Sequence, residues 1–302
     1  MKISELECQS INDEIFGKKQ LKVFMLRLDQ SDAIISGNKW FKLKYNLIEA
    51  KKTHCQTVLS FGGAYSNHLH ALATAAKSFG FSSIGIIRGE PVESLNNTLQ
   101  DVVNMGMHLH YIDRKTYRNK TNPKFLNQLI NSFVAEYGKI YLVPEGGTNN
   151  FALQGAAEIP QIIKINYDYL CLGCGTGGTL AGIATAAEVQ NNVQIVGFPA
   201  LKGAGFLTND IHQLHQDYQH KQYQNWSLNL DYHFGGFGKK NKQLLSFLDY
   251  FYKRHQIELD FVYTGKMMYG IYDLAEKNYF EPDSTIVCIH TGGVQGNRSL
   301  IN

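Results

Sequence analysis

Short runs rich in β-branched and aromatic residues alternate with longer segments of helical periodicity along almost the whole chain. This alternation is typical of α/β proteins, in which a helix connects each strand to the next parallel strand. The pattern predicts strands over residues 22–26, 57–60, 83–87, 108–112, 140–142, 167–172, 194–197 and 285–289. It predicts helices over residues 38–52, 66–78, 94–105, 123–137, 151–164, 178–189, 240–254 and 266–277. We therefore expect an α/β fold with parallel-rich sheets flanked by helices.

The composition is ordinary for a globular protein. The chain has 302 residues, a hydrophobic content of 44% and a formal net charge of +3, which gives no reason to expect nucleic acid or a membrane as partner. No apolar run approaches the roughly 20 residues of a membrane span, and the first residues lack the apolar segment of a signal peptide. The five cysteines are odd in number and lie mostly in apolar runs. We therefore expect reduced thiols in a cytoplasmic protein.

Two lysines lie at the start of the helix predicted over 38–52. Asn38 is a good N-cap residue, which puts Lys39 in the first turn. The positive end of the helix dipole disfavours a nearby cation by roughly 0.3–1 kcal/mol. Such a lysine readily loses its proton, and a neutral amine can form a Schiff base with an aldehyde. Lys42, one turn later, can hold an anionic group of the same ligand; the alternative is a solvated basic helix end.

A glycine pair follows the strand predicted over 57–60 and opens the next helix. Ser66 and Asn67 bring a hydroxyl and an amide to the helix start, where free N–H groups favour a carboxylate or phosphate. The alternative is that Ser66 serves only as an N-cap after a tight turn. His68 and His70 lie on different helix faces and make a poor metal pair. We expect these imidazoles to be solvated or locally hydrogen-bonded.

A second glycine-rich turn, over residues 173–179, joins a strand to a helix of small residues. Its backbone N–H groups and threonine hydroxyls suit a phosphate. The glycine spacing also matches the dinucleotide fingerprint, but no acidic residue follows about 20 positions later to hold a ribose. A single phosphate therefore fits better, and a nicotinamide-dependent oxidoreductase is disfavoured. Cys171 and Cys174 have no second cysteine pair, so we expect them to pack in the interior and expect no metal site.

Two segments near the C-terminus complete a set of groups. Tyr263 and Thr264 lead into a helix, and Thr291 begins a glycine turn after a strand. With the lysines and the phosphate loop they provide an amine, a phosphate cradle, hydroxyls and a phenol. That set matches the needs of pyridoxal 5′-phosphate, whose aldehyde, phosphate and ring nitrogen each require a partner.

On these motifs the chain resembles the family that contains 1-aminocyclopropane-1-carboxylate deaminase and D-cysteine desulfhydrase. The likeness runs from the Ser36-Gly37-Asn38-Lys39 segment to Gly293. It implies the two-domain tryptophan-synthase-β-like fold, which is fold type II of the pyridoxal-phosphate enzymes. It also implies a larger cofactor-binding domain of residues 1–43 and 150–302, and a smaller inserted domain of residues 44–149. Family members are commonly homodimers.

The resemblance implies a role for each matching residue. Lys39 would bind the cofactor covalently, Lys42 would contact its phosphate, and Asn67 its ring hydroxyl. The other cofactor-binding positions would be Gly175, Thr176, Gly177, Gly178, Thr179, Thr264 and Thr291. Ser66 would act in proton transfer or nucleophilic assistance near the substrate, and Tyr263 is the matching active-site tyrosine. The Ser66, Asn67 and His68 turn would receive the substrate carboxylate.

Two positions bear on the reaction. In the deaminase, a glutamate matching Thr264 keeps the cofactor's ring nitrogen protonated, whereas a neutral threonine supports a weaker electron sink. The threonine favours β-elimination, from D-cysteine or a similar amino acid, giving pyruvate, ammonia and sulfide. The alternative is 1-aminocyclopropane-1-carboxylate deaminase activity. Phe237 stands where relatives carry a second tyrosine and lacks its hydroxyl, which leaves open a non-catalytic relative that binds cofactor or amino acid.

Overall fold

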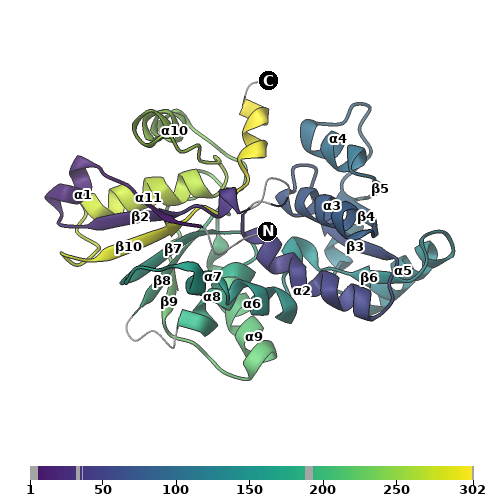
Figure 1. The fold of residues 1–302 in the computed structure, drawn as a ribbon. Coiled ribbons are helices and arrows are strands. Elements are labelled where there is room, and N and C mark those ends of the chain that lie inside the picture. The colour runs from purple at the N-terminus through teal and green to yellow at the C-terminus, as the bar shows by residue number, and fades with distance from the viewer. Residues whose placement is uncertain (1–5, 32–34, 36, 188–192, 301–302) are drawn as a thin grey trace.

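The computed structural model describes residues 6–31, 35, 37–187 and 193–300 (Figure 1). Ser36 of the lysine segment and residues 188–189 of a predicted helix lie outside the described residues. The helices are α1 Glu14–Lys18, α2 Asn38–Lys52, α3 Asn67–Phe79, α4 Asn97–Asn104, α5 Pro123–Tyr137, α6 Asn150–Ala156, α7 Ile159–Ile162, α8 Gly178–Ala187, α9 Leu207–Gln219, α10 Lys242–His255 and α11 Thr264–Glu276. Short 3-10 turns include η3 Thr116–Asn119, η4 Glu145–Gly147 and η6 Val294–Leu300.

The larger sheet has six strands in the order β1-β2-β10-β7-β8-β9. Its strands are β1 Cys8–Ser10, β2 Lys22–Leu26, β7 Tyr169–Cys174, β8 Gln194–Pro199, β9 Trp226–Leu228 and β10 Thr285–Ile289. Among the strand pairs of this sheet in the described residues, only β1–β2 is antiparallel. Figure 1 shows α1, α10 and α11 on one face and α6 to α9 on the other. Both faces of β7 are therefore buried: Leu170 and Leu172 join one core, and Cys171 joins the opposite one.

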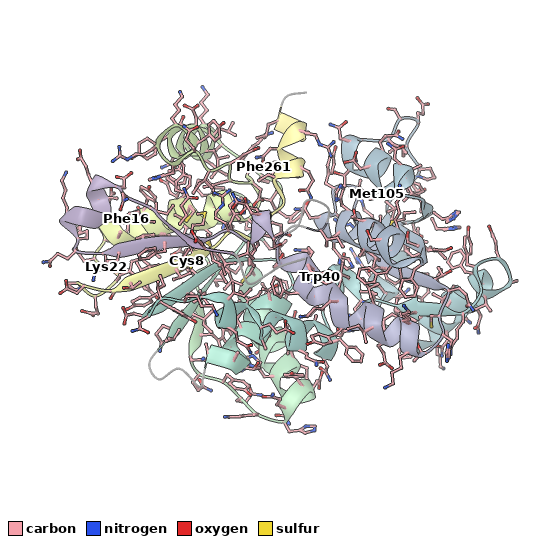
Figure 2. The ribbon with its side chains drawn as sticks, in the orientation of Figure 1. Cys8, Phe16, Lys22, Trp40, Met105 and Phe261 are labelled. Carbon is pink, nitrogen blue, oxygen red and sulfur yellow. The ribbon has the colours of Figure 1, made fainter. Side chains whose placement is uncertain are left out.

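The smaller sheet has four parallel strands in the order β5-β4-β3-β6. They are β3 Thr57–Gly62, β4 Ser82–Arg88, β5 Met107–Ile112 and β6 Ile140–Leu142. Val58 packs with residues of α2, α3 and α4, whereas Leu59 packs on the other face beside α5. In Figure 2, Phe16 lies on the side of the larger sheet and Met105 on the side of the smaller one.

The predicted α/β class with parallel-rich sheets is confirmed. Five predicted elements have the observed bounds: β2, β6, β10, α2 and α5. The helix predicted over 151–164 is divided into α6 and α7, and β1, β9, α1 and α9 were not predicted. All strands of the smaller sheet fall within residues 44–149, but the domain limits 1–43, 44–149 and 150–302 stay a prediction.

The cysteines are unpaired in the structure, and Cys55, Cys171, Cys174 and Cys288 are buried. Cys171 and Cys174 pack in hydrophobic cores, as predicted. Within the described ranges, every helix is too short or too polar to span a bilayer.

Close helix packing holds α2 against the larger sheet. A side chain at Gly155 of α6 would place its Cβ 1.7 Å from the carbonyl oxygen of Phe41 in α2. A side chain at Gly182 of α8 would come within 2.5 Å of the Leu153 carbonyl oxygen. Both neighbours are backbone atoms, so neither contact can relax by a rotamer change. The position of α2 therefore depends on glycine at residue 155.

We predict that Gly155→Ala lowers the free energy of unfolding by about 1–3 kcal/mol or more, because the added methyl group forces α2 and α6 apart. Gly17→Ala is the matched control. Gly17 also lies in a helix, but nothing lies within 4 Å of its added Cβ, and we expect a gain of about 0.4–1 kcal/mol. Urea unfolding of both variants measures the difference. Equal midpoints would contradict the packing argument.

Candidate active site

A cavity of about 670 Å³ lies where the turns after β3, β7 and β10 meet the start of α2. Ligands collect at the carboxyl ends of parallel strands, so this is the expected edge of both sheets. Most predicted site residues line it: Lys39, Ser66, Asn67, His68, Gly175, Thr176, Gly177, Gly178, Thr179, Tyr263 and Thr291. Lys42 and Thr264 lie behind the lining and are 3% and 0% exposed.

The start of α2 differs from the prediction. Gly37 is the N-cap, with φ 80° and ψ −164°, and Asn38 is the first helical residue. The Asn38 side chain turns inward instead of capping the helix: its Nδ2 donates to Thr179 Oγ1 at 2.7 Å, and its Oδ1 accepts from Lys39 Nζ at 2.9 Å. Asn38 therefore links the amine to the glycine-rich turn before α8.

Lys39 carries the perturbed amine that the sequence suggests. Burial lowers the pKa of the Lys39 amine to about 8, although the Asp260 carboxylate opposes the shift. The unprotonated fraction of this amine near neutral pH is therefore far larger than that of an exposed lysine, whose pKa is about 10.4. An unprotonated amine in an enclosed site is suited to attack a carbonyl carbon.

Lys42 and the turn over 173–179 form an anion-binding group. Lys42 Nζ donates to Thr148 Oγ1 at 2.9 Å and to Thr176 Oγ1 at 3.4 Å. Burial, followed by the charge of Lys39, holds the pKa of Lys42 well below its ordinary value. A Cβ at Gly178 would stand 3.2 Å from Lys42 Nζ, so glycine keeps this space open. A buried lysine amine that bonds two threonine hydroxyls beside a helix start fits a phosphate.

Ser66 is both a helix N-cap and a residue of the cavity wall, the two roles that its sequence position allows. Ser66 Oγ accepts the Leu69 N–H at 3.2 Å as the N-cap of α3, and Ser66 also lines the cavity. Asn67 Oδ1 accepts from Gln295 of η6 at 3.1 Å, which ties the turn to the larger sheet's C-terminal segment. The cavity therefore has the first turn of α3 on one wall.

The two histidines are locally bonded. His68 is 4% exposed and its Nε2 lies 2.8 Å from Ser60 Oγ, so the solvated alternative is wrong for it. Burial, with the charges of Lys42 and Lys39, holds the pKa of His68 well below its ordinary value, which makes it a neutral imidazole. His70 instead faces Asp101, with 3.4 Å between Nε2 and Oδ2.

Tyr263 and Phe237 form an aromatic wall. Their ring centroids lie 6.0 Å apart in an edge-on arrangement, and both line the cavity. A Cβ at Gly175 would lie 3.1 Å from the Tyr263 hydroxyl, so the phenol rests against the turn after β7. Burial raises the pKa of Tyr263, which keeps the phenol protonated and able to donate a proton.

Asp260 is a lining residue that the sequence reasoning missed. Its carboxylate accepts the N–H groups of Val262, Tyr263 and Thr264 at 2.8–2.9 Å, and the Thr264 hydroxyl at 2.6 Å. The structure thus places the Thr264 hydroxyl against Asp260 and brings Asp260 to the cavity. A carboxylate four residues before Thr264 was the available signal, since acidic groups stabilise helix starts.

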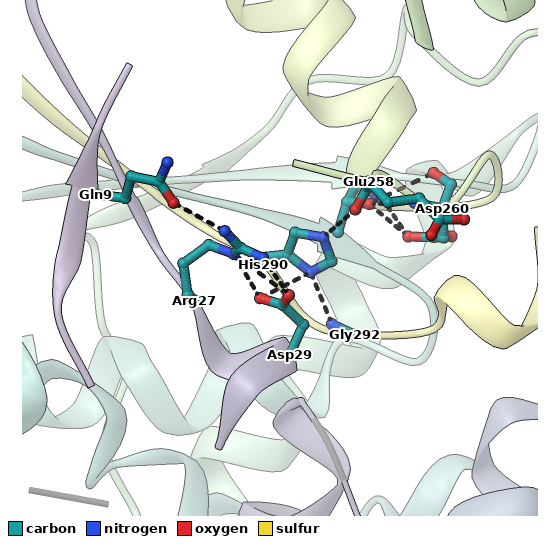
Figure 3. A network of polar contacts seen from close by, with 8 residues as sticks. Gln9, Arg27, Asp29, Glu258, Asp260, His290 and Gly292 are labelled. Carbon is teal, nitrogen blue, oxygen red and sulfur yellow. Dashed lines mark hydrogen bonds and ion pairs between the residues drawn. The ribbon is translucent and has the colours of Figure 1, made fainter. Parts of the chain in front are cut away.

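His290 fixes the glycine turn after β10 (Figure 3). It is fully buried; its Nδ1 accepts the Gly292 N–H at 3.2 Å, so its Nε2–H donates to the Glu258 carbonyl at 2.7 Å. Asp29, bonded to Arg27, lies 3.6 Å from the same Nδ1. These contacts hold Thr291 at the cavity wall.

Comparison with known proteins agrees with this geometry. Residues 17–292 match the family model described as pyridoxal-phosphate dependent enzyme. A putative 1-aminocyclopropane-1-carboxylate deaminase of Pyrococcus horikoshii is 30% identical over 282 residues, covering 91% of this chain and 85% of the relative. A bifunctional D-cysteine desulfhydrase/1-aminocyclopropane-1-carboxylate deaminase of Arabidopsis thaliana is 26% identical, covering 91% and 73%. A D-cysteine desulfhydrase of Klebsiella pneumoniae is 24% identical, covering 90% and 87%.

Solved structures show the same architecture. The crystal structure of an ACC deaminase homologue has a TM-score of 0.85 and 29% identity, covering 97% of this chain and 90% of its own. An O-acetylserine dependent cystathionine beta-synthase from Helicobacter pylori has a TM-score of 0.67 at 14% identity, covering 98% and 95%, which shows the fold alone. The predicted fold type II is confirmed.

We predict that Lys39 of the protein freed of pyridoxal phosphate titrates near pH 8, well below an exposed lysine at about 10.4. Reductive methylation followed by mass spectrometry measures this midpoint, with exposed lysines as internal controls. In Asp260→Asn the midpoint should move to still lower pH, because the carboxylate that stabilises the ammonium is lost. A Lys39 midpoint equal to that of the exposed lysines would contradict the burial argument.

Proposed function

This chain belongs to the pyridoxal-phosphate dependent enzyme family, and from that premise we propose that it catalyses β-elimination on a small amino acid. The proposed substrate is D-cysteine or a similar amino acid, which with one water gives pyruvate, ammonia and hydrogen sulfide. The observation that carries the proposal is the convergence in one cavity of the Lys39 amine, the Lys42 anion site and the Tyr263 phenol.

The described residues fit the cofactor. Lys39 would hold its aldehyde carbon, and Lys42 with Thr176 and the N–H groups of the turn over 175–179 would hold its phosphate. Asn67 and Thr291 would contact the ring from the walls. When bound, pyridoxal phosphate supplies an electron sink for bond breaking at the substrate's Cα.

The chain's own groups divide the proton transfers. The Lys39 amine, with a pKa near 8, is matched to accept the Cα proton near neutral pH. Tyr263 stays protonated and can donate to the leaving sulfur. The first turn of α3, after Ser66, offers N–H groups and a hydroxyl to the substrate carboxylate.

Two alternatives remain in view. Activity as a 1-aminocyclopropane-1-carboxylate deaminase is supported by the names of several relatives. A non-catalytic relative is supported by Phe237, which presents a ring without a hydroxyl at the cavity wall. We also propose a cytoplasmic homodimer, which the free cysteines and the likeness to the family support. Sedimentation equilibrium tests the dimer, and a monomer mass would reject it.

We predict that the wild-type protein mixed with pyridoxal phosphate develops visible absorption and releases pyruvate from D-cysteine or β-chloro-D-alanine. Lys39→Ala should lose both, because the amine assigned to the aldehyde carbon is removed, while its circular dichroism is unchanged. Lys240→Ala is the matched control, since this exposed lysine also lines the cavity but has no assigned role.

The substrate panel decides among the alternatives. Besides D-cysteine and β-chloro-D-alanine, the panel includes L-cysteine, D-serine and 1-aminocyclopropane-1-carboxylate. Turnover of the cyclopropane alone would favour the deaminase and reject β-elimination. Visible absorption without turnover of any compound would favour the non-catalytic relative.

We predict that Tyr263→Phe lowers kcat by about 10²-fold or more, the usual contribution of a positioned acid. The ring and its contact with Phe237 are kept, so the fold and the visible absorption should not change. Tyr65→Phe removes a hydroxyl from an exposed tyrosine of the same cavity and should leave kcat unchanged. Equal kcat values for all three proteins would remove Tyr263 from the proton transfer.

A further inference from the structure

Arg88 supplies a cation at the cavity that the proposed function does not use. It is the last residue of β4 and lines the cavity beside the turn that leads to Ser66. A Cβ at Gly63 would lie 3.7 Å from Arg88 Nη2, so the guanidinium rests directly against this turn. Across the part of the chain that the structure describes, no carboxylate comes within ion-pair distance of Arg88.

The Arg88 guanidinium is oriented by an aromatic ring. Its central carbon lies 5.8 Å from the ring centroid of Tyr117, a buried residue of η3. The Tyr117 hydroxyl donates to Glu145 Oε1 at 2.6 Å, which fixes the ring. This cation–π contact places the guanidinium beside the ring at 5.8 Å and leaves its N–H groups free to donate to an anion.

The acidic residues of the cavity are already engaged. Glu145 accepts from Tyr117 and pairs with Lys120, with 3.3 Å between Nζ and Oε2. Asp260 is held by the first N–H groups of α11. Lys42 is accounted for by the cofactor phosphate, and the first turn of α3 by the substrate's α-carboxylate. Arg88 therefore remains available for a further negative charge.

We propose that Arg88 binds an anionic group on the substrate's β-carbon, so that the enzyme accepts amino acids whose leaving group carries its own negative charge. The inference rests on the proposed β-elimination. O-phosphoserine represents the class: its Cα–H and Cβ–O bonds break, and the phosphate departs with the Cβ–O electron pair. With one water the products are pyruvate, ammonia and phosphate.

The test compares kcat/KM for O-phosphoserine and β-chloroalanine, both enantiomers of each, in wild-type protein and Arg88→Met. Loss of a charge-assisted hydrogen bond should lower kcat/KM for O-phosphoserine about 10- to 100-fold. The value for β-chloroalanine, whose leaving group is a neutral substituent before it departs, should stay the same. Arg88→Lys should restore only part of the loss, because a point charge replaces a bidentate donor.

Arg118→Met is the matched control, because this exposed arginine of η3 does not line the cavity; neither substrate should be affected. Equal losses for both substrates in Arg88→Met would place the shared α-carboxylate at Arg88 and overturn the proposal. The proposal would also be overturned if Arg88→Met lost activity on neither substrate. The same holds if the wild-type protein turned over β-chloroalanine but not O-phosphoserine.

Failure of the proposed function has a separate signature, which is the absence of pyruvate from either substrate. In that case, calorimetric titration of wild-type protein and Arg88→Met with O-phosphoserine tests the anion site without turnover. Affinity that falls about tenfold in the variant supports the anion site, and equal or absent binding rejects it.

Discussion

The close approach of the chain at Gly37 to the end of β10 positions most of the groups in the cavity. Any side chain at Gly37 would place its Cβ 2.0 Å from the Thr291 carbonyl oxygen, so only glycine allows α2 to begin there. From this point α2 runs from one sheet to the other: Phe41 belongs to a core of the larger sheet, and Leu43 to the core of the smaller one. The reactive amine thus lies on the element that joins the two halves.

That placement has an electrostatic cost. Lys39 and Lys42 are largely enclosed, and no carboxylate of the described ranges pairs with either one. An unpaired buried ammonium costs several kcal/mol, which lowered pKa values relieve in part. A phosphate dianion relieves it further, because it supplies the missing charge. The burial of the two lysines without a paired carboxylate therefore makes Lys39 reactive and also makes the cavity select an anionic cofactor.

The sequence predicted what local patterns determine. The bounds of α2 and α5, the strands other than β1 and β9, and the place of Lys39 in the first turn of α2 follow from periodicity and strand order. Asn38 was misassigned as a cap because its side chain bonds Thr179, 141 residues away. Thr148 was missed because its partner, Lys42, is 106 residues away in the sequence and meets it only after folding. The segment of α9 did carry a signal: Leu207, Ile211 and Leu214 recur at helical spacing.

The Asp260–Thr264 contact changes the chemistry that the Thr264 hydroxyl can offer to a ligand. Taken alone, Thr264 is a neutral hydroxyl that favours a weak electron sink. In the fold its Oγ1 accepts the Asp260 N–H at 2.9 Å and donates to the Asp260 carboxylate at 2.6 Å. The hydroxyl proton is thereby committed, and a buried negative charge is bonded directly to it. Thr264 by itself therefore does not separate elimination from ring opening. The discrimination passes to other residues of the cavity lining, among them Arg88 and Tyr263, for which we propose contacts with the leaving group.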